Sequence, residues 1–311
     1  MPLSGCKITA KFRQYQKKSQ QSFTDCWDFY KLLMIYAFTA TEILVKARKR
    51  GVISAVLIGD LDRIRKLLEG LNEPEEDYEL IFCPDEGEAG RMAVSLVNEG
   101  MADIPMKGLM MTSSFMKAIL DKEKGFLKPG RLLNQATVLE YTDENRMMII
   151  SDCAVNIAPT YEDKIKITQN CIELAHELGI EKPNIAFLSA LEKVNPKIQS
   201  TVDAVALTQY ANAGGFKGAG EAFGPVALDI AVDAQCARHK GVHHPVCGHA
   251  DILIVPDLAS GNIFTKSLTF FAHLNSAGTL NGTTNAVIMT SRTDTPEDKY
   301  DSILTAVLKA M

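Results

Sequence analysis

Three residues near the end of the chain have side chains that could act together in a reaction. The apolar run of residues 286–289 leads through Thr290 into Ser291 and Arg292, and Asp298 stands a few positions later. An arginine at the buried end of a strand needs an anionic partner, because an unpaired buried charge costs a large desolvation free energy. An acyl or phosphoryl group in transfer would supply that partner.

Asp298 also has a purely structural interpretation. The stretch Thr295-Pro296-Glu297-Asp298 has the pattern of a helix start, with Thr295 as N-cap and Pro296 in the first helical position. Asp298 then stands where its carboxylate completes a capping box. The sequence leaves both roles open for this carboxylate, helix cap and participant in catalysis.

Other polar residues follow apolar runs elsewhere in the chain. They are Lys107, Thr112, Ser113, Ser114, Asp152, Asn156, Ser260, Gly261, Asn262 and Lys266. The hydroxyls of 112–114 could cap the following helix or, together with backbone N–H groups, hold an anion. Lys107 could be a solvated charge or a ligand group, and 260–262 could be a simple turn whose glycine allows close backbone approach.

The elements that must position these residues alternate along the chain from residue 32 onward. Short apolar runs alternate with amphipathic helical patterns, which is typical of β-α units that feed a largely parallel sheet. The runs are nearly all apolar, as expected for strands covered by helices on both faces. Residues 136–142 and 146–152 indicate a hairpin around 143–145, and we expect one helix near 227–241 and another at 265–274.

We therefore predict a two-lobed three-layer α/β/α fold with largely parallel sheets and an interdomain cleft. Residues 1–140 and 282–311 form the first domain in this prediction, and residues 141–281 form the second. Ligands of open parallel sheets bind beyond the carboxyl ends of the strands, where helices begin. The polar residues named above are therefore candidates for one binding site.

Two further segments suggest a cofactor or a metal but do not fit the patterns. Residues 214–224 are rich in glycine without the spacing G-x-G-x-x-G, so we predict a mobile loop near the cleft rather than a dinucleotide-binding loop. Residues 239–249 contain four histidines and one cysteine, but their spacing matches none of the usual zinc patterns. We predict a surface histidine cluster and no metal.

The composition excludes several classes of partner. The net charge of -5 provides no basic field for nucleic acid or an anionic membrane surface. No apolar run approaches the roughly 20 residues that span a bilayer. Seven scattered cysteines with no C-x-x-C favour a reducing, cytoplasmic compartment. We interpret the basic residues 1–24 as a surface segment rather than a targeting peptide.

The chain resembles the phosphate acetyl/butyryltransferase family, and its phosphate butyryltransferases most of all, from about residue 32 to the C-terminus. Four motifs carry the resemblance in the same order: MKGLMMTSSFMKAIL, SDCAVNIAPTYEDKIKITQN, PDLASGNIFTKSL and MTSRTDTPEDKYDSI. The resemblance implies the reversible reaction butanoyl-CoA + phosphate = butanoyl phosphate + CoA. It implies direct transfer in a ternary complex without metal or covalent acyl-enzyme, no cofactor beyond coenzyme A as substrate or product, and a homo-oligomer of at least two chains.

The resemblance also implies roles for particular residues. Ser291 and Arg292 match the catalytic Ser-Arg pair of the family, and Asp298 matches the aspartate proposed as base toward the CoA thiol. Residues 112–114 would hold phosphate, and residues 260–262 would line the same cleft. Arg131 is only a candidate for a second phosphate-binding arginine, because the stretch RLLNQATVLE matches the family loosely.

Three alternatives stay open at this point. The first is phosphate acetyltransferase, which would differ only in the acyl pocket. The second is a catalytically idle relative that binds acyl-CoA. The third is a decarboxylating dehydrogenase of the isocitrate/isopropylmalate type, which needs a cluster of metal-binding aspartates that is not recognisable in the sequence.

Overall fold

The computed structural model describes residues 30–35, 38–141, 146–291 and 293–311. It divides into two compact units. One unit consists of the chain up to Pro129 together with Ala277–Met311, and the other consists of Gly130–Ser276. None of the helices in the described ranges is long and apolar enough to cross a membrane.

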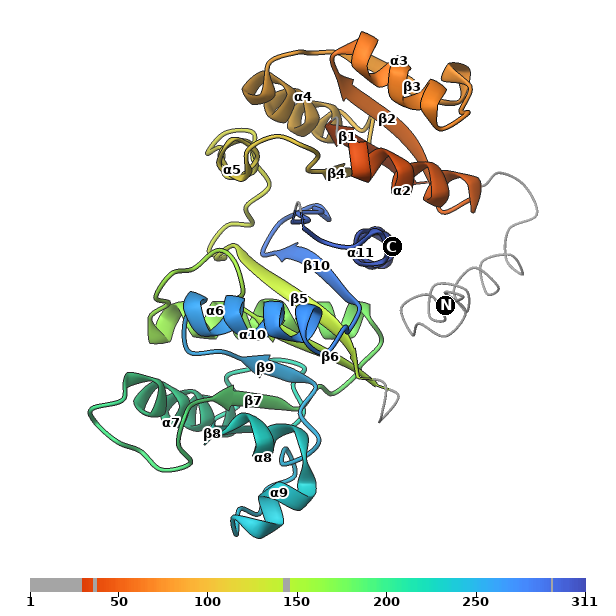
Figure 1. Cartoon of the computed structure of the whole chain (residues 1–311). Helices are drawn as coiled ribbons and strands as arrows, with labels where there is room; N and C mark the ends of the chain where they lie inside the picture. The colour runs from red at the N-terminus through yellow and green to blue at the C-terminus, as the bar shows by residue number, and fades with distance from the viewer. Residues whose placement is uncertain (1–29, 36–37, 142–145, 292) are drawn as a thin grey trace, which may run out of the picture. The chain divides into compact units, whose positions relative to one another are not determined.

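The first unit contains a parallel sheet of four strands in the order β3-β2-β1-β4 (Figure 1). The strands are β1 (Tyr30–Ile35), β2 (Ile53–Gly59), β3 (Glu79–Phe82) and β4 (Ile104–Met106). Helices α2 (Phe38–Lys49), α3 (Leu61–Gly70) and α4 (Glu86–Asn98) make the crossovers, and a short 3-10 helix, η2 (Glu75–Asp77), precedes β3. Since such crossovers are right-handed, α2 and α3 cover one face and α4 covers the other, which gives three layers.

The last helix of the chain completes this unit. Helix α11 (Pro296–Ala310) packs beside α2, and its side chains Ile303 and Leu304 are fully buried. The short helix α5 (Thr112–Ile119) follows β4, and strand β10 (Ser276–Asn281) leads back into the unit from the second one.

The second unit has a mixed sheet in which the strands follow the order β5-β6-β9-β7-β8. Strands β5 (Asn134–Tyr141) and β6 (Arg146–Ser151) form an antiparallel hairpin, as predicted, although its turn lies outside the described residues. The others, β7 (Ile185–Leu188), β8 (Ala222–Val226) and β9 (Ile252–Ile254), run parallel to β6. Because β5 pairs with β6 along its length, it belongs to this unit, whereas the sequence-based division placed residues up to 140 in the first domain.

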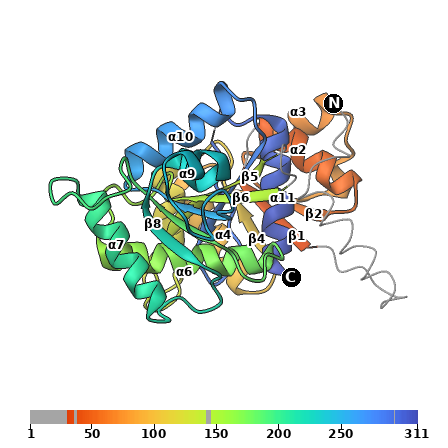
Figure 2. The ribbon, with the colours of Figure 1, turned by 90° about the horizontal axis from the view of Figure 1, so that it is seen from below.

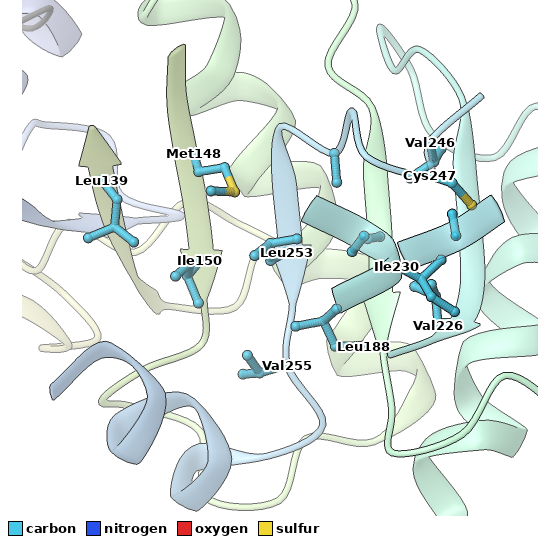
Figure 3. Packing of buried hydrophobic residues seen from close by; sticks show 14 of the residues in the cluster. Leu139, Met148, Ile150, Leu188, Val226, Ile230, Val246, Cys247, Leu253 and Val255 are labelled. Carbon is cyan, nitrogen blue, oxygen red and sulfur yellow. The ribbon is translucent and has the colours of Figure 1, made fainter. Parts of the chain in front are cut away.

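Helices cover both faces of this second sheet. Figure 2 shows α6 (Tyr161–Glu177) and α7 (Gln199–Asn212) on one side of the strands and α9 (Ala234–His239) and α10 (Leu258–Phe270) on the other. The side chains of Met148, Ile150 and Leu253 belong to one buried cluster together with Ile230 of the short helix α8 (Leu228–Val232) (Figure 3). Ile149, between Met148 and Ile150, is equally buried on the opposite face, since successive strand residues alternate. Burial on both faces explains why the strands are apolar throughout, and the predicted α/β class is confirmed.

Two local predictions in this unit were wrong, and one helix was missed. The segment 227–241 is two helices, because Asp233 has an extended backbone (φ -132°, ψ 113°) and its carboxylate caps α9 by accepting from the N–H groups of Gln235 and Cys236. Residues 260–262 form the first turn of α10 rather than a free turn. The helix α7 was not predicted at all, since its apolar residues are small and do not form a clear stripe.

The glycine-rich segment 214–224 joins α7 to β8. Gly218 has φ +81°, and a Cβ there would lie 2.4 Å from the ring of His176. His176 Nε2 in turn lies 2.9 Å from Gly218 O. The structure therefore explains this glycine by close packing against α6 rather than by loop mobility, and the end of the segment, residues 222–226, is strand β8.

Candidate active site

In the first unit, two of the segments whose polar residues follow a predicted strand lie at the same edge of the sheet. The N–H of Lys107 donates to Ile288 O and the N–H of Ile288 donates to Pro105 O, both at 3.0 Å, so residues around 288 run parallel beside β4. Strand β4 also neighbours β1, and the strand order reverses between them. Open α/β sheets bind ligands at the carboxyl ends of such strands. Lys107 and Ser291 both leave the sheet at this edge.

Lys107 is not a solvated charge. Its side chain is buried, with 3% of the residue exposed, and Nζ donates to the carbonyl oxygens of Gly108 and Met110 at 3.3 and 3.4 Å. The amino group of Lys107 is therefore held within the loop that follows β4 and does not project into solvent.

The three hydroxyl residues 112–114 form the first turn of α5, but none of them is its cap. Met111 occupies the N-cap position and makes no side-chain capping hydrogen bond. Thr112 and Ser113 are exposed and Ser114 is partly exposed. The first backbone N–H groups of a helix have no acceptor within it and lie at the positive end of its dipole. In α5 the N–H of Ser114 already donates to Met111 O at 3.1 Å, so the N–H groups of Thr112 and Ser113, together with the hydroxyls, can hold a phosphate.

Ser291 is exposed in a turn that leads into α11. Its N–H donates to Asp294 Oδ2 at 2.6 Å, and its Oγ lies 3.1 Å from the hydroxyl oxygen of Thr293. Lys299 fixes the same turn, because its Nζ donates to Asp294 O at 2.7 Å. Ser291 therefore presents its hydroxyl from a hydrogen-bonded turn. Arg292 lies outside the described residues.

Asp298 forms the predicted capping box with Thr295. Its Oδ2 accepts from the N–H of Thr295 at 3.0 Å and from the Thr295 hydroxyl at 2.7 Å. Thr295 Oγ1 accepts from the N–H of Asp298 at 3.1 Å, and Asp298 is only 3% exposed. The structural interpretation of Asp298 is thus confirmed, and its role as a base stays a prediction.

In the second unit, one carboxylate organises the loop that follows β6. Asp152 Oδ1 accepts from the N–H groups of Ala154 and Val155 at 3.0 and 3.1 Å and from that of Gln135 at 3.3 Å. Its Oδ2 accepts from the N–H of Asn156 at 3.0 Å and from the Asn156 side-chain amide. Sequence reasoning noticed Asp152 only as a polar residue at a strand end, and nothing in the local pattern indicates this organising role.

The start of α10 packs directly on that loop. Asp257 and Ser260 form a capping box, in which Asp257 Oδ1 accepts from the N–H of Ser260 at 2.8 Å. A Cβ on Gly261 would lie 2.3 Å from Asp152 O, so only glycine fits there, and Asn262 Nδ2 donates to Cys153 O at 3.2 Å. The close backbone approach predicted for this glycine is confirmed. Lys266 is exposed one turn further along the helix.

Arg131, the candidate for a second phosphate-binding arginine, has partners inside the second unit. Its guanidinium forms an ion pair with Glu173 of α6. Its Nη1 also donates to Asn170 Oδ1 at 3.1 Å. The charge of Arg131 is therefore compensated by protein groups in this structure.

Cys153, in the loop that follows β6, has an unreactive thiol. Burial raises the pKa of Cys153 to about 12, so its thiol is protonated at neutral pH. A thiol rather than a thiolate is a poor nucleophile. Cys153 is thus unsuited to form a covalent acyl intermediate.

The histidine-rich segment 239–249 shows packing rather than a ligand set. His244 stacks on Phe223 with ring centroids 4.4 Å apart, and burial lowers the pKa of His244. Across the described ranges, no group of three or more His, Cys, Asp or Glu side chains could hold a metal ion.

The sequence profile described as "Phosphate acetyl/butaryl transferase" matches residues 86–307, which include the polar residues at strand ends described above. The chain belongs to this phosphate acetyl/butyryltransferase family. It is therefore a phosphate acyltransferase by family, and the resemblance read from the four motifs is confirmed.

Individual members of the phosphate acetyl/butyryltransferase family are similar over most of their length. The chain is 38% identical over 269 residues to a phosphate butyryltransferase of Clostridium acetobutylicum, covering 86% of this chain and 89% of that protein. It is 39% identical over 262 residues to a phosphate acetyltransferase of Thermotoga maritima, covering 84% and 88%. The crystal structure of a branched-chain phosphotransacylase from Enterococcus faecalis matches with a TM-score of 0.79 and 32% identity, covering 90% of this chain and 98% of that one.

Proposed function

We propose that the chain catalyses butanoyl-CoA + phosphate = butanoyl phosphate + CoA. The observation that carries this proposal is the convergence of Lys107 and Ser291 at the carboxyl edge of one sheet, in a chain of the phosphate acetyl/butyryltransferase family. The 38% identity to a phosphate butyryltransferase supports butanoyl as the acyl group.

Phosphate binds first-turn N–H groups and hydroxyls of α5 in this proposal. Residues 112–114 are accessible, and the buried ammonium of Lys107 precedes them in the same loop. Arg292, immediately after Ser291 in the sequence, adds a planar guanidinium that suits two phosphate oxygens at once. These groups hold phosphate with one oxygen directed at the thioester carbonyl.

The transfer itself needs no covalent enzyme intermediate. A phosphate oxygen attacks the carbonyl carbon of butanoyl-CoA, and the carbonyl oxygen gains negative charge as the carbon becomes tetrahedral. Arg292 and the hydroxyl of Ser291 stabilise that charge. The C–S bond then breaks, the electron pair leaves with sulfur, and butanoyl phosphate and CoA are released.

Asp298 handles the proton of the CoA thiol. In the direction of butanoyl-CoA synthesis, its carboxylate accepts the thiol proton so that the thiolate attacks butanoyl phosphate. In the opposite direction the attacking hydrogenphosphate gives up a proton, and the protonated carboxyl delivers a proton to the departing sulfur. The capping box holds this carboxylate at the start of α11, which fixes its position relative to Ser291.

Acetyl-CoA is the second candidate acyl donor. The 39% identity to a phosphate acetyltransferase of Thermotoga maritima favours it about as strongly as the butyryltransferase identity favours butanoyl-CoA. The two activities differ only in the length of the acyl chain. A direct comparison of the two donors therefore decides between them.

The test is release of free thiol from butanoyl-CoA and from acetyl-CoA, each with and without phosphate. We expect phosphate-dependent release and a higher kcat/KM for butanoyl-CoA. A higher kcat/KM for acetyl-CoA would reassign the acyl group. Absence of release from both donors, in a protein that still binds CoA in a titration, would indicate the idle relative instead.

We further propose that the active species is a homo-oligomer of at least two chains in the cytoplasm. Family membership supports oligomerisation, and the scattered cysteines support a reducing compartment. Light scattering after size exclusion tests the first point, since a monomer mass would contradict it.

A further inference from the structure

The side-chain amide of Asn156 is held in one orientation by two acceptors. Its Nδ2 donates to Leu133 O at 2.9 Å and to Asp152 Oδ2. Both partners can only accept, so the nitrogen must face them and the oxygen must face away. The orientation of this amide is therefore set by chemistry.

Asp152 is the residue that makes this orientation rigid. Its Oδ2 binds the side-chain amide and the backbone N–H of Asn156, while its Oδ1 holds the N–H groups of Ala154 and Val155. Asp152 is 3% exposed, and Gly261 packs against its carbonyl oxygen. One buried carboxylate thus fixes the loop and the amide at its end.

The side-chain carbonyl oxygen of Asn156, Oδ1, faces away from these partners. Within the described part of the chain, no group donates a hydrogen bond to Asn156 Oδ1, and the residue is partly exposed. A carbonyl oxygen accepts from N–H or O–H groups and repels the oxygens of an anion. The amide is therefore suited to a neutral donor group rather than to fully ionised phosphate.

We propose that Asp152 is a positioning residue that orients Asn156 to accept a hydrogen bond from an N–H or O–H group of the acyl-CoA. This inference rests on the proposed function, because it assigns one substrate of that reaction to Asn156. The donor is either an amide or hydroxyl of the pantetheine arm or a donor of the nucleotide.

The test compares Asn156→Ala with Asn184→Ala. Asn184 is a matched control, because it is also partly exposed, its N–H donates to a carboxylate (Asp251 Oδ2, 2.8 Å), and its Nδ2 donates to a loop carbonyl (His249 O, 3.2 Å). It precedes β7, at the opposite end of the strands, and its Oδ1 already accepts from the N–H of Glu221. Both variants should lose similar stability.

We expect Asn156→Ala to raise KM for butanoyl-CoA by about 3- to 10-fold, the value of one neutral hydrogen bond. KM for phosphate and kcat should change little, and Asn184→Ala should leave all three near wild type. Equal KM changes in the two asparagine variants, or a rise in KM for phosphate alone, would overturn the proposal. If Asn156→Ala does not fold, Asn156→Ser removes the carbonyl while its hydroxyl can still donate one hydrogen bond.

The positioning role of Asp152 has its own readout. Asp152→Asn should raise KM for butanoyl-CoA in the same direction, and adding Asn156→Ala to it should raise KM little further, since both changes remove the same contact. Additive effects would contradict a positioning role. Repeating the measurements with butanoyl-pantetheine locates the donor, because the effect persists for a donor on the arm and disappears for one on the nucleotide.

Failure of the proposed function is distinguishable from failure of this inference. Without phosphate-dependent thiol release by the wild-type protein, the proposed reaction is wrong. A CoA titration by calorimetry then tests the inference without turnover. Weaker CoA binding by Asn156→Ala than by Asn184→Ala would support it, and equal binding would overturn it.

Discussion

Asp298 Oδ2 accepts both the backbone N–H and the hydroxyl of Thr295, at 3.0 and 2.7 Å. One carboxylate therefore caps α11 and is also the candidate base of the reaction. The capping role affects stability and the base role affects the reaction rate, so two substitutions can separate them.

Asp298→Asn should lower kcat by about 10²- to 10⁴-fold, the usual contribution of a general base. Its amide oxygen can still accept from Thr295, so the melting temperature should change little. Thr295→Ala removes the cap and should cost about 1 kcal/mol of unfolding free energy, with a much smaller loss of kcat. A similar loss of kcat in both variants, in proportion to their loss of stability, would show that Asp298 acts only as a cap.

Arg292→Ala should lower kcat by about 10²- to 10³-fold, because the guanidinium stabilises charge that develops in the transition state. Arg292→Lys keeps the charge but loses the planar two-donor geometry, so it should recover only part of the rate. Circular dichroism and melting temperature serve as the folding control. Near-normal kcat in folded Arg292→Ala would eliminate the assigned role.

Gly261→Ala should destabilise the second unit by about 1–3 kcal/mol, the usual cost of forcing a methyl into packed surroundings. The new Cβ would lie 2.3 Å from Asp152 O, so the loop after β6 or the start of α10 must move. Gly70→Ala is the matched control, because no atom lies within 4 Å of its Cβ position in α3. Urea unfolding measures both, and equal effects would contradict the close contact.

The stability of the first unit should fall at acid pH because of Glu73. Burial alone raises the pKa of Glu73, but hydrogen bonds from Lys49 and Arg48 outweigh it and lower the pKa below its usual value. The pKa is thus lower in the folded chain than in the unfolded chain. The stabilisation is present above the unfolded pKa of about 4.3 and is lost as the pH falls through the folded pKa.

Glu73→Gln should lower the free energy of unfolding by about 1–3 kcal/mol at pH 7. The loss is limited to this range because Arg48 and Lys49 keep some contact with water, which screens the ion pairs. The difference from wild type should shrink below pH ~4, where Glu73 itself becomes protonated. Glu75→Gln is the control, because its ion pair with Arg65 is exposed on both sides and should contribute much less to stability. Urea unfolding at pH 7 and pH 3.5 checks this, and a constant difference across pH would contradict it.

Features encoded in a few adjacent residues could be predicted from the sequence. The capping box at Thr295 and Asp298 is one example, since cap, proline and carboxylate all lie within one turn. The alternation of apolar strands and amphipathic helices is another, and it was enough for the fold class. The catalytic role assigned to Arg292 is a prediction made from the sequence alone, because this residue lies outside the described ranges.

Features that depend on distant segments could not be predicted. Asp152 organises its loop through Gln135 and Gly261, which are far from it in the sequence. The sequence left Lys107 open as a solvated charge or a ligand group, and the carbonyl partners that hold its amino group come from the folded loop. Sequence patterns report local periodicity, whereas these roles depend on which segments meet in three dimensions.

The first unit is assembled from two parts of the chain that are separated by the whole of the second unit. During synthesis on a ribosome, residues 130–276 emerge before residues 277–311. The second unit can therefore fold while the first still lacks α11 and the segment beside β4, consistent with domain-wise folding of nascent chains. Ser291 and Asp298 are made after the second unit, so a nascent chain that has reached only residue 276 has the sheet edge but not the groups assigned to catalysis.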